Sequence, residues 1–288
     1  MKYLDPKADL TFKKVFGCHP DLLISLLNAL LPLSDDEQIE SVEYLQSEVV
    51  PELYEHKSSM VDVLCKDVCG RMFCVEMQME WTMAFKQRVL FNASKLYVTQ
   101  ARKNERYSEL HPVYSLNLVN DIIENDLEDE LIHNYRIVHD KHNHKVIEEL
   151  HFTFIELPKF KPGIMLEKRM AILWLRFLTE ISDRTKHVPS ELLESPPINR
   201  ALEEVKVTAF SEEELRAYDK FWDSVRTEKT LQHDRELKGR AEGRAEGRLA
   251  QQIDSARIML SSGLSMDDVS RFTGLTLQQV EHLSRKDS

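Results

Sequence analysis

Two short apolar runs joined by a polar turn constrain the fold of this chain more than any other feature. Residues 60–65 (MVDVLC) and 73–79 (FCVEMQM) have the Val, Phe and Leu content of buried strands. The connection at 66–71 (KDVCGR) has the polar residues and the glycine of a hairpin turn. We therefore predict a β-hairpin whose two strands lie in the core of a domain.

Three polar side chains interrupt these apolar runs. Asp62 lies in the first run, and Glu76 and Gln78 lie in the second, two residues apart and so on one face of the strand. A hairpin folded symmetrically about Cys69 sets Asp62 opposite Glu76 on that face. Two buried carboxylates are costly without a partner, and Mg²⁺ or Mn²⁺, which prefer oxygen ligands, would neutralise both. The motif alone leaves open that the polar residues only line a wet face.

Length and charge limit the classes of protein that fit. The 288 residues permit one large domain or two small ones, and the formal net charge of −11 argues against a protein that coats nucleic acid. A nuclease with a local basic groove is still compatible with that charge. No apolar stretch is long enough for a membrane span, so we expect no membrane partner. Three of the four cysteines crowd into the predicted hairpin, a poor disulfide framework that favours the reducing cytoplasm.

The periodicity along the chain predicts an α/β fold. We expect helices that begin at Asp9 and at Pro20, and a long helix from about Thr82 to Lys103. The expected strands are near 39–45, in the 60–79 hairpin, at 112–119, at 135–138 and at 146–157. From about Gly163 onward the pattern is helical throughout. This order suits a mixed sheet flanked by helices, followed by an all-α C-terminal region.

Several segments, in this order, resemble one known family. They are 5–17 (DPKADLTFKKVFG), Asp62 with Glu76-x-Gln78, 85–88 (FKQR) followed by Tyr97, 112–118 (PVYSLNL) and 238–248 (KGRAEGRAEGR). The set resembles the recombination-promoting nucleases, a family of PD-(D/E)XK transposases, over essentially the whole chain. The resemblance implies a restriction-endonuclease-like fold. It also implies a Mg²⁺- or Mn²⁺-dependent DNA endonuclease that hydrolyses phosphodiester bonds and promotes recombination. The alternative is a catalytically weak DNA- or partner-binding protein of a mobile element.

The resemblance also implies roles for individual residues. Asp62 and Glu76 would hold the metal ion together with the backbone carbonyl of Met77. The wider fold has a lysine where this chain and its family have Gln78, which can hydrogen-bond a water molecule but carries no charge. Loss of one electrostatic stabiliser costs a factor of roughly 10²–10³ in rate, so weak activity fits the sequence. Asp9 would be a further catalytic acid, unless it only caps the first helix.

The helix that follows the motif has a basic face. Residues at three- and four-residue spacing share it, namely Arg88, Asn92, Lys95, Thr99 and Arg102. We predict that Arg88, Lys95 and Arg102 bind the DNA backbone. The alternative is a solvated helix face, whose opposite side holds Leu90, Ala93, Leu96 and Tyr97. The histidines of 139–144 (HDKHNH) are expected in a polar turn between two strands.

The C-terminal sequence divides into two further segments. We predict a nuclease domain with a helical extension at 1–230, a charged glycine-repeat helix or linker at 231–250 and a small helical tail at 251–288. Glycine costs about 1 kcal/mol in a helix, so the stripe of Gly239, Gly243 and Gly247 favours close packing, such as a homo-oligomer. A linker and direct DNA contact are the alternatives. The tail has the rhythm of a helix-turn-helix, but its second helix has few basic residues.

Overall fold

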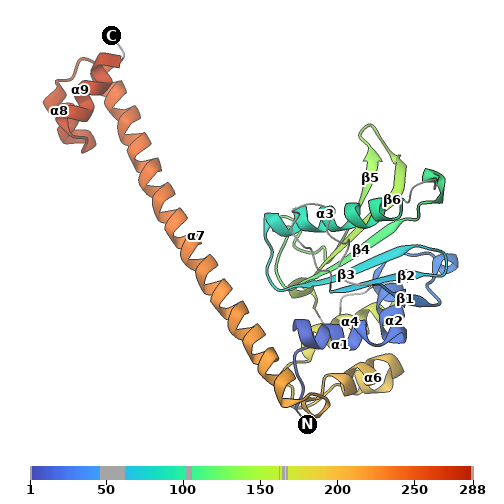
Figure 1. The fold of residues 1–288 in the computed structure, drawn as a ribbon. Helices are drawn as coiled ribbons and strands as arrows, with labels where there is room; N and C mark the ends of the chain where they lie inside the picture. Colours follow the sequence, from blue (N-terminus) through green and yellow to red (C-terminus); the bar gives the residue numbers. More distant parts are fainter. Residues whose placement is uncertain are drawn as a thin grey trace. The chain divides into compact units, whose positions relative to one another are not determined.

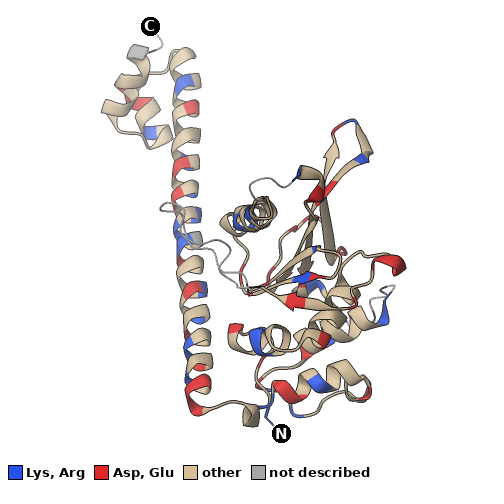
Figure 2. Ribbon diagram, turned by 45° about the vertical axis from the view of Figure 1, so that its right-hand side comes forward, with Lys and Arg blue, Asp and Glu red and all other residues tan. Residues whose placement is uncertain are grey.

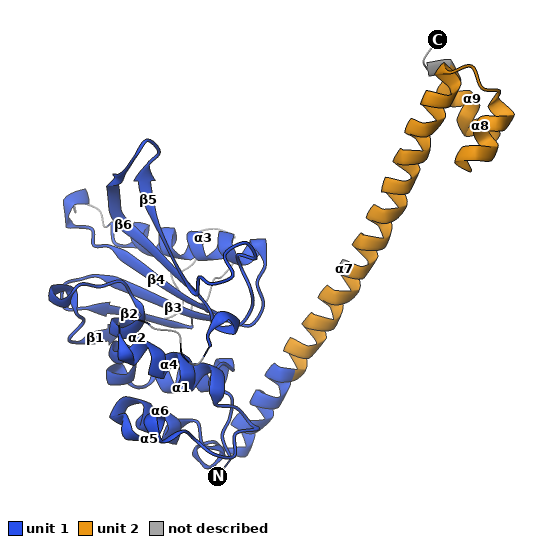
Figure 3. Cartoon of the chain, turned by 180° about the vertical axis from the view of Figure 1, so that it is seen from behind, with its two compact units in different colours: residues 1–222 blue, residues 223–288 orange. Residues whose placement is uncertain are grey.

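The computed structural model describes residues 2–45, 62–101, 106–161, 163, 166 and 168–286. The chain forms two compact units, residues 1–222 and residues 223–288 (Figure 3). The first unit contains the β-sheet and the second is helical (Figure 3). In the described part of the chain, no helix combines the length and the apolar character needed to cross a bilayer.

The sheet of the first unit is mixed, as the sequence predicts. Its strands are β1 (Val42–Tyr44), β2 (Val63–Asp67), β3 (Met72–Gln78), β4 (Val113–Val119), β5 (Ile132–His139) and β6 (His142–Glu156). They lie in the order β1-β2-β3-β4-β6-β5 among the described residues. The β3–β4 and β4–β6 pairs are parallel, and the other three pairs are antiparallel. A six-stranded mixed sheet with helices on its faces and a helical C-terminal region confirms the predicted α/β, restriction-endonuclease-like class.

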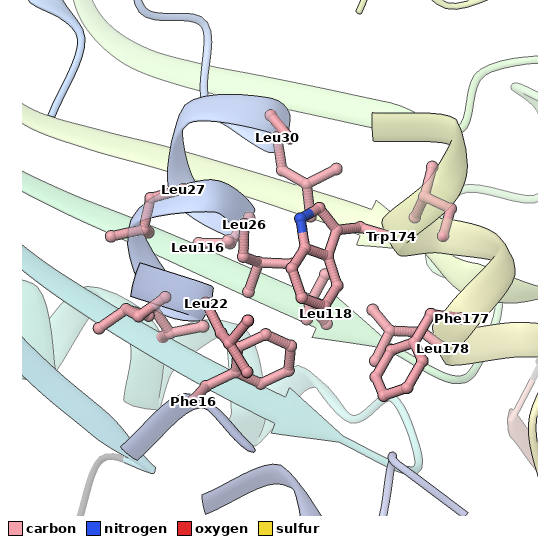
Figure 4. Packing of buried hydrophobic residues seen from close by; sticks show 14 of the residues in the cluster. Phe16, Leu22, Leu26, Leu27, Leu30, Leu116, Leu118, Trp174, Phe177 and Leu178 are labelled. Carbon is pink, nitrogen blue, oxygen red and sulfur yellow. The ribbon is translucent and has the colours of Figure 1, made fainter. Parts of the chain in front are cut away.

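Helices cover both faces of this sheet (Figure 1). They are α1 (Asp9–Gly17), α2 (Pro20–Leu30), α3 (Met83–Thr99), α4 (Arg169–Glu180), α5 (Ser190–Glu194) and α6 (Pro196–Glu204), followed by the first turns of α7 (Glu212–Ser261). Helices α1, α2 and α4 pack on one face around the buried Trp174, with Phe16 and Phe177 in ring contact (Figure 4). Helix α3 packs on the other face, with Ala93 and Leu96 buried against Cys74 and Val113.

The β2–β3 hairpin has the register that the sequence predicts. Val63 pairs with Val75 and Lys66 pairs with Met72, which is a symmetric arrangement about Cys69. The turn requires glycine at Gly70, because its φ is +83° and a Cβ there would lie 2.6 Å from the His111 ring. Side chains alternate between faces, so Glu76 and Gln78 share the α3 side of the sheet with the buried Cys74. The hairpin therefore directs Glu76 and Gln78 toward α3.

The opening segment of the chain ties several helices together. The Lys7 ammonium donates to the Leu178 carbonyl at the end of α4 and pairs with Asp5, both at 2.9 Å. The Thr11 hydroxyl donates to the Asp5 carbonyl, and the Asp5 N–H donates to the Tyr218 hydroxyl of α7 at 2.9 Å. Most polar residues of this segment therefore serve the fold and not a site.

Two predicted features of the strands and helices differ from the structure. The long helix was expected to reach Lys103, but α3 ends at Thr99. The histidines of 139–144 were expected in a turn, but His139 ends β5 and His142 begins β6, with a two-residue turn between them. This part of the hairpin is exposed to solvent on both faces, so no apolar alternation marks it as strand in the sequence.

The second unit consists of the rest of α7 together with α8 (Met266–Thr273) and α9 (Leu277–Lys286). The 231–250 segment lies within α7 and is helical, and Lys and Arg alternate along it with Asp and Glu (Figure 2). The helices of this unit are separated at Gly263 and Gly274, which have φ of +83° and +74°. A small core joins the three helices, formed by Ala256, Val269, Leu275, Val280 and Leu283.

Candidate functional site

The structure brings Asp62 and Glu76 together at the open end of the β2–β3 hairpin. Asp62 lies one residue before β2, and its Oδ2 accepts a hydrogen bond from the Met77 N–H at 2.8 Å. Glu76 lies on β3 and is 4% exposed. The symmetric register predicts this arrangement, because it places position 62 beside position 76. Two acidic side chains, one on β3 and one just before β2, thus share one partly buried site.

Burial perturbs the charge state of Asp62. Removal from water is the largest cause and raises the pKa of the Asp62 carboxyl to about 6. The negative charges of Asp9 and Glu76 act in the same direction. The Met77 N–H and the Lys13 ammonium act against it, because both favour the ionised carboxylate. The site therefore has less positive charge than its carboxylates require.

Helix α3 holds Glu76 from the opposite side. The Asn92 amide donates to Glu76 Oε1 at 2.9 Å, and Arg88 Nη2 lies 3.4 Å from Glu76 Oε2. Asn92 was expected on the solvent side of α3, yet it is buried, whereas Leu90 was expected on the apolar side and is exposed. The reason is physical: the side of α3 that faces the sheet must supply hydrogen-bond donors to a buried carboxylate. The predicted assignment of helix faces was wrong at these two residues.

Gln78 is tied at both ends of its amide. Its Nε2 donates to the Glu80 backbone carbonyl at 2.9 Å, and its Oε1 accepts from Arg88 Nη2 at 2.9 Å. Arg88 was predicted as a DNA-binding residue, and its side chain lies 47% exposed beside the motif. Arg88 thus contacts both polar residues of β3 while it keeps access to solvent.

Asp9 lies at the start of α1 but does not cap it. The capping position is Ala8, no side-chain cap forms, and Asp9 is the first helical residue. The predicted capping interpretation is therefore wrong. Asp9 instead pairs with Lys13 one turn later at 2.6 Å, and the same ammonium lies 3.8 Å from Asp62 Oδ1. Lys13 was missed in the sequence, although its i, i+4 spacing from Asp9 is a signal for an ion pair.

The two remaining predicted DNA contacts are less informative. Lys95 lies on α3 with its ammonium 5.9 Å from the centre of the Phe91 ring. Arg102 lies outside the described residues, as do residues 60 and 61 of the motif's first run. Of the three predicted basic residues, the structure describes Arg88 and Lys95, and contact of all three with DNA stays a prediction.

The donor set fits a hard divalent cation. Asp62 and Glu76 offer carboxylate oxygens, and Met77 offers a backbone carbonyl on the same side of β3 as its N–H, which points at Asp62. Oxygen ligands of this kind suit Mg²⁺ or Mn²⁺. Among the described residues, no three His, Cys, Asp or Glu side chains come close enough to form a metal site. Asp9 therefore does not complete a three-carboxylate cluster in the described part of the chain.

The comparisons with known proteins agree with this geometry at the level of the family. Neither the curated proteins nor the solved structures compared with the chain contain a match. A family model described as PD-(D/E)XK nuclease family transposase matches residues 6–233, which include the whole sheet and all the site residues. The match supports a nuclease-like function. Nucleases of the PD-(D/E)XK type generally depend on a divalent metal ion. The chain belongs to the family of PD-(D/E)XK nuclease transposases.

Proposed function

We propose that this protein is a Mg²⁺- or Mn²⁺-dependent DNA endonuclease that hydrolyses phosphodiester bonds and promotes recombination. One observation carries the proposal: the hairpin register brings Asp62 and Glu76 close to the Met77 carbonyl in a partly buried site that is rich in oxygen ligands. Membership of the nuclease family supports it. Burial of these carboxylates without a cation would lower the free energy of unfolding, and a bound metal ion would offset that loss.

Asp62, Glu76 and the Met77 carbonyl would hold the cation. When bound, such a cation lowers the pKa of a coordinated water and offsets charge that develops on the phosphate. The Met77 N–H fixes one oxygen of Asp62, and the Asn92 amide fixes one oxygen of Glu76, so both carboxylates are oriented before the metal binds. The other oxygens, Asp62 Oδ1 and Glu76 Oε2, lie 3.8 Å from the Lys13 ammonium and 3.4 Å from Arg88 Nη2, so the cation would share them with these two residues.

Asp9 and Lys13 complete the electrostatics on the α1 side. Lys13 lies between Asp9 and Asp62 and partly offsets both charges. In our proposal the catalytic contribution of Asp9 is to position this ammonium. Arg88, Lys95 and Arg102 would contact the DNA backbone along α3, which would give a local basic surface on a chain whose formal net charge is −11.

A catalytically weak DNA- or partner-binding protein is the second candidate function. The observation that favours it is the neutral Gln78, whose amide is occupied by Glu80 and Arg88 and therefore offers little to a reacting water. This candidate predicts DNA binding without metal-dependent cleavage.

A plasmid-nicking assay separates the two functions. Full-length protein is incubated with supercoiled plasmid in Mg²⁺, in Mn²⁺ or in EDTA. We expect nicking only with metal, and at least a 10³-fold loss in Asp62→Ala and in Glu76→Ala, because each removes a metal ligand. Glu43→Ala is the matched control, since Glu43 is an exposed acid on β1 of the same sheet. Unchanged cleavage in either site variant contradicts the proposed site, and DNA binding without cleavage in the wild type supports the second function.

A further inference from the structure

Gln78 is oriented in only one way by its neighbours. The Glu80 carbonyl can only accept a hydrogen bond, and the Arg88 guanidinium can only donate one. The amide nitrogen must therefore point at Glu80 and the amide oxygen at Arg88. The Phe85 ring, centred 4.9 Å from the Arg88 guanidinium carbon, supports the same side chain from α3. The residue in the motif thus holds the end of an arginine from the neighbouring helix.

The positive charge of Arg88 is less offset by neighbouring carboxylates than that of Lys13, the other cation of the site. Lys13 lies 2.6 Å from Asp9 and 3.8 Å from Asp62, so two carboxylates share its charge. Arg88 contacts the neutral Gln78 at 2.9 Å and reaches Glu76 only at 3.4 Å. Both hydrogen bonds that Arg88 makes within the described part of the chain use Nη2. The planar fork therefore keeps Nε–H and Nη1 donors for another acceptor.

Hydrolysis of a phosphodiester makes a demand that this arrangement meets. Negative charge spreads over the phosphoryl oxygens as the water attacks, and a positioned cation stabilises it. A half-exposed guanidinium beside the carboxylate pair can reach a phosphate oxygen and can bind it through two N–H groups at once. A neutral amide cannot supply that charge.

We propose that Arg88 is a catalytic residue that binds the scissile phosphate and stabilises its developing charge, and that Gln78 is a positioning residue that aims Arg88. The inference rests on the proposed nuclease function and deepens it. It also replaces the expectation that Gln78 itself holds the attacking water. The geometry behind it is the chain of contacts from the Glu80 carbonyl through Gln78 to Arg88.

The first test removes the charge. We expect Arg88→Ala to lower single-turnover cleavage by roughly 10²–10³-fold, and Arg88→Lys to retain part of the activity because it retains the charge but not the fork. Lys86→Ala is the matched control. It removes a positive charge from the same helix, but Lys86 faces Glu124 and the Tyr135 ring, away from the motif. This control should cleave at the wild-type rate.

The second test moves the charge to the strand. A lysine at position 78 would place an ammonium where the Arg88 guanidinium now meets the amide. The double variant Gln78→Lys/Arg88→Ala should therefore recover at least tenfold over Arg88→Ala alone. Gln78→Ala should lose less than Arg88→Ala, because the guanidinium is still present but is no longer aimed.

Two further measurements do not depend on turnover. Mn²⁺ binding measured by calorimetry should be at least as tight in Arg88→Ala as in the wild type, since removal of a neighbouring cation cannot weaken the attraction of Glu76 for metal. Binding of a DNA duplex in Ca²⁺, followed across a salt series, should show a log–log slope smaller by about one in Arg88→Ala. Melting temperatures of all variants identify any that fail to fold.

The outcomes separate this inference from the function on which it rests. A wild-type protein that never cleaves contradicts the proposed function and with it the role of Arg88. A cleaving wild type with an equally active Arg88→Ala overturns only the inference. Loss of Mn²⁺ affinity in parallel with cleavage would make Arg88 a support of the metal site instead. Failure of the lysine to restore any activity would overturn the charge role.

Discussion

At the scale of single residues, Asp62 is the carboxylate of the candidate site whose pKa is raised by burial. Its carboxyl has a pKa of about 6, against 3.8 for an unperturbed aspartate, mainly because of burial. The folded protein therefore binds more protons than the unfolded chain between about pH 4 and pH 6. The free energy of unfolding consequently falls as the pH rises through this window, and above pH 6 the ionised Asp62 costs about 3 kcal/mol.

The Asp62→Asn variant tests this assignment. An asparagine can still accept the Met77 N–H but carries no charge, so it should stabilise the metal-free protein at pH 7.5 by up to about 3 kcal/mol. The difference should vanish below about pH 4, where Asp62 is protonated in both states. Urea unfolding in EDTA at the two pH values measures it. Equal stability of the two proteins at pH 7.5 would show that burial does not strain this carboxylate.

Asn92 is the second residue with a defined effect, because it orients Glu76. Asn92→Leu keeps the side-chain volume on the buried face of α3 but removes the donor to Glu76 Oε1. Loss of such an orienting hydrogen bond typically lowers metal affinity 10–100-fold. Titration of Mn²⁺ by calorimetry should show this loss. Gln87→Ala, an exposed amide on the same helix, is the control and should bind Mn²⁺ like the wild type.

At the scale of elements, the sequence carried most information where burial and polarity alternate clearly. The β2–β3 register could be predicted because a single symmetric fold aligns two apolar runs about Cys69. The buried side of α3 could not be predicted. Asn92 donates a hydrogen bond to the Glu76 carboxylate, but in the sequence a polar residue at this position looks like part of a solvated helix face. The pairing of Asp9 with Lys13 could have been predicted from their four-residue spacing, but the approach of Lys13 to Asp62 could not, because Asp62 is distant in sequence.

The glycine stripe of α7, formed by Gly239, Gly243 and Gly247, has no packing partner among the described residues. A Cβ added at Gly239, Gly243 or Gly247 would meet no atom of the described residues within 4 Å. Three glycines weaken a helix by roughly 1 kcal/mol each, so we propose that a second copy of the chain packs on the stripe. Gly243→Leu should then lower the particle mass measured by light scattering. Ala245→Leu, on another side of the same exposed helix, should not; equal masses in all three proteins would contradict a homo-oligomer through this stripe.

At the scale of the whole molecule, the boundary of the nuclease domain can be tested by where the chain is ended. Tyr218 and Trp222 of α7 belong to a cluster with Leu4 and Phe210, so α7 begins inside the first unit. A chain that ends at Leu231 should fold and keep metal-dependent cleavage. A chain that ends at Phe210 should lose several kcal/mol of stability, because Tyr218 no longer covers the opening segment. Circular dichroism melting of the two proteins measures the difference.

The hydrogen bonds between residues 2–5 and residues 205–218 also determine the order in which parts of the fold can form. The Leu4 N–H donates a hydrogen bond to the Val205 carbonyl, and the Val207 N–H donates to the Lys2 carbonyl. The Asp5 N–H donates to the Tyr218 hydroxyl. A ribosome releases residues one by one from the N-terminus, so the first residues made are among the last to find their partners. The β2–β3 hairpin is synthesised long before Tyr218, so a growing chain carries the proposed site residues before the contacts of the opening segment can form. The order of synthesis thus places the packing of the opening segment after the formation of the sheet.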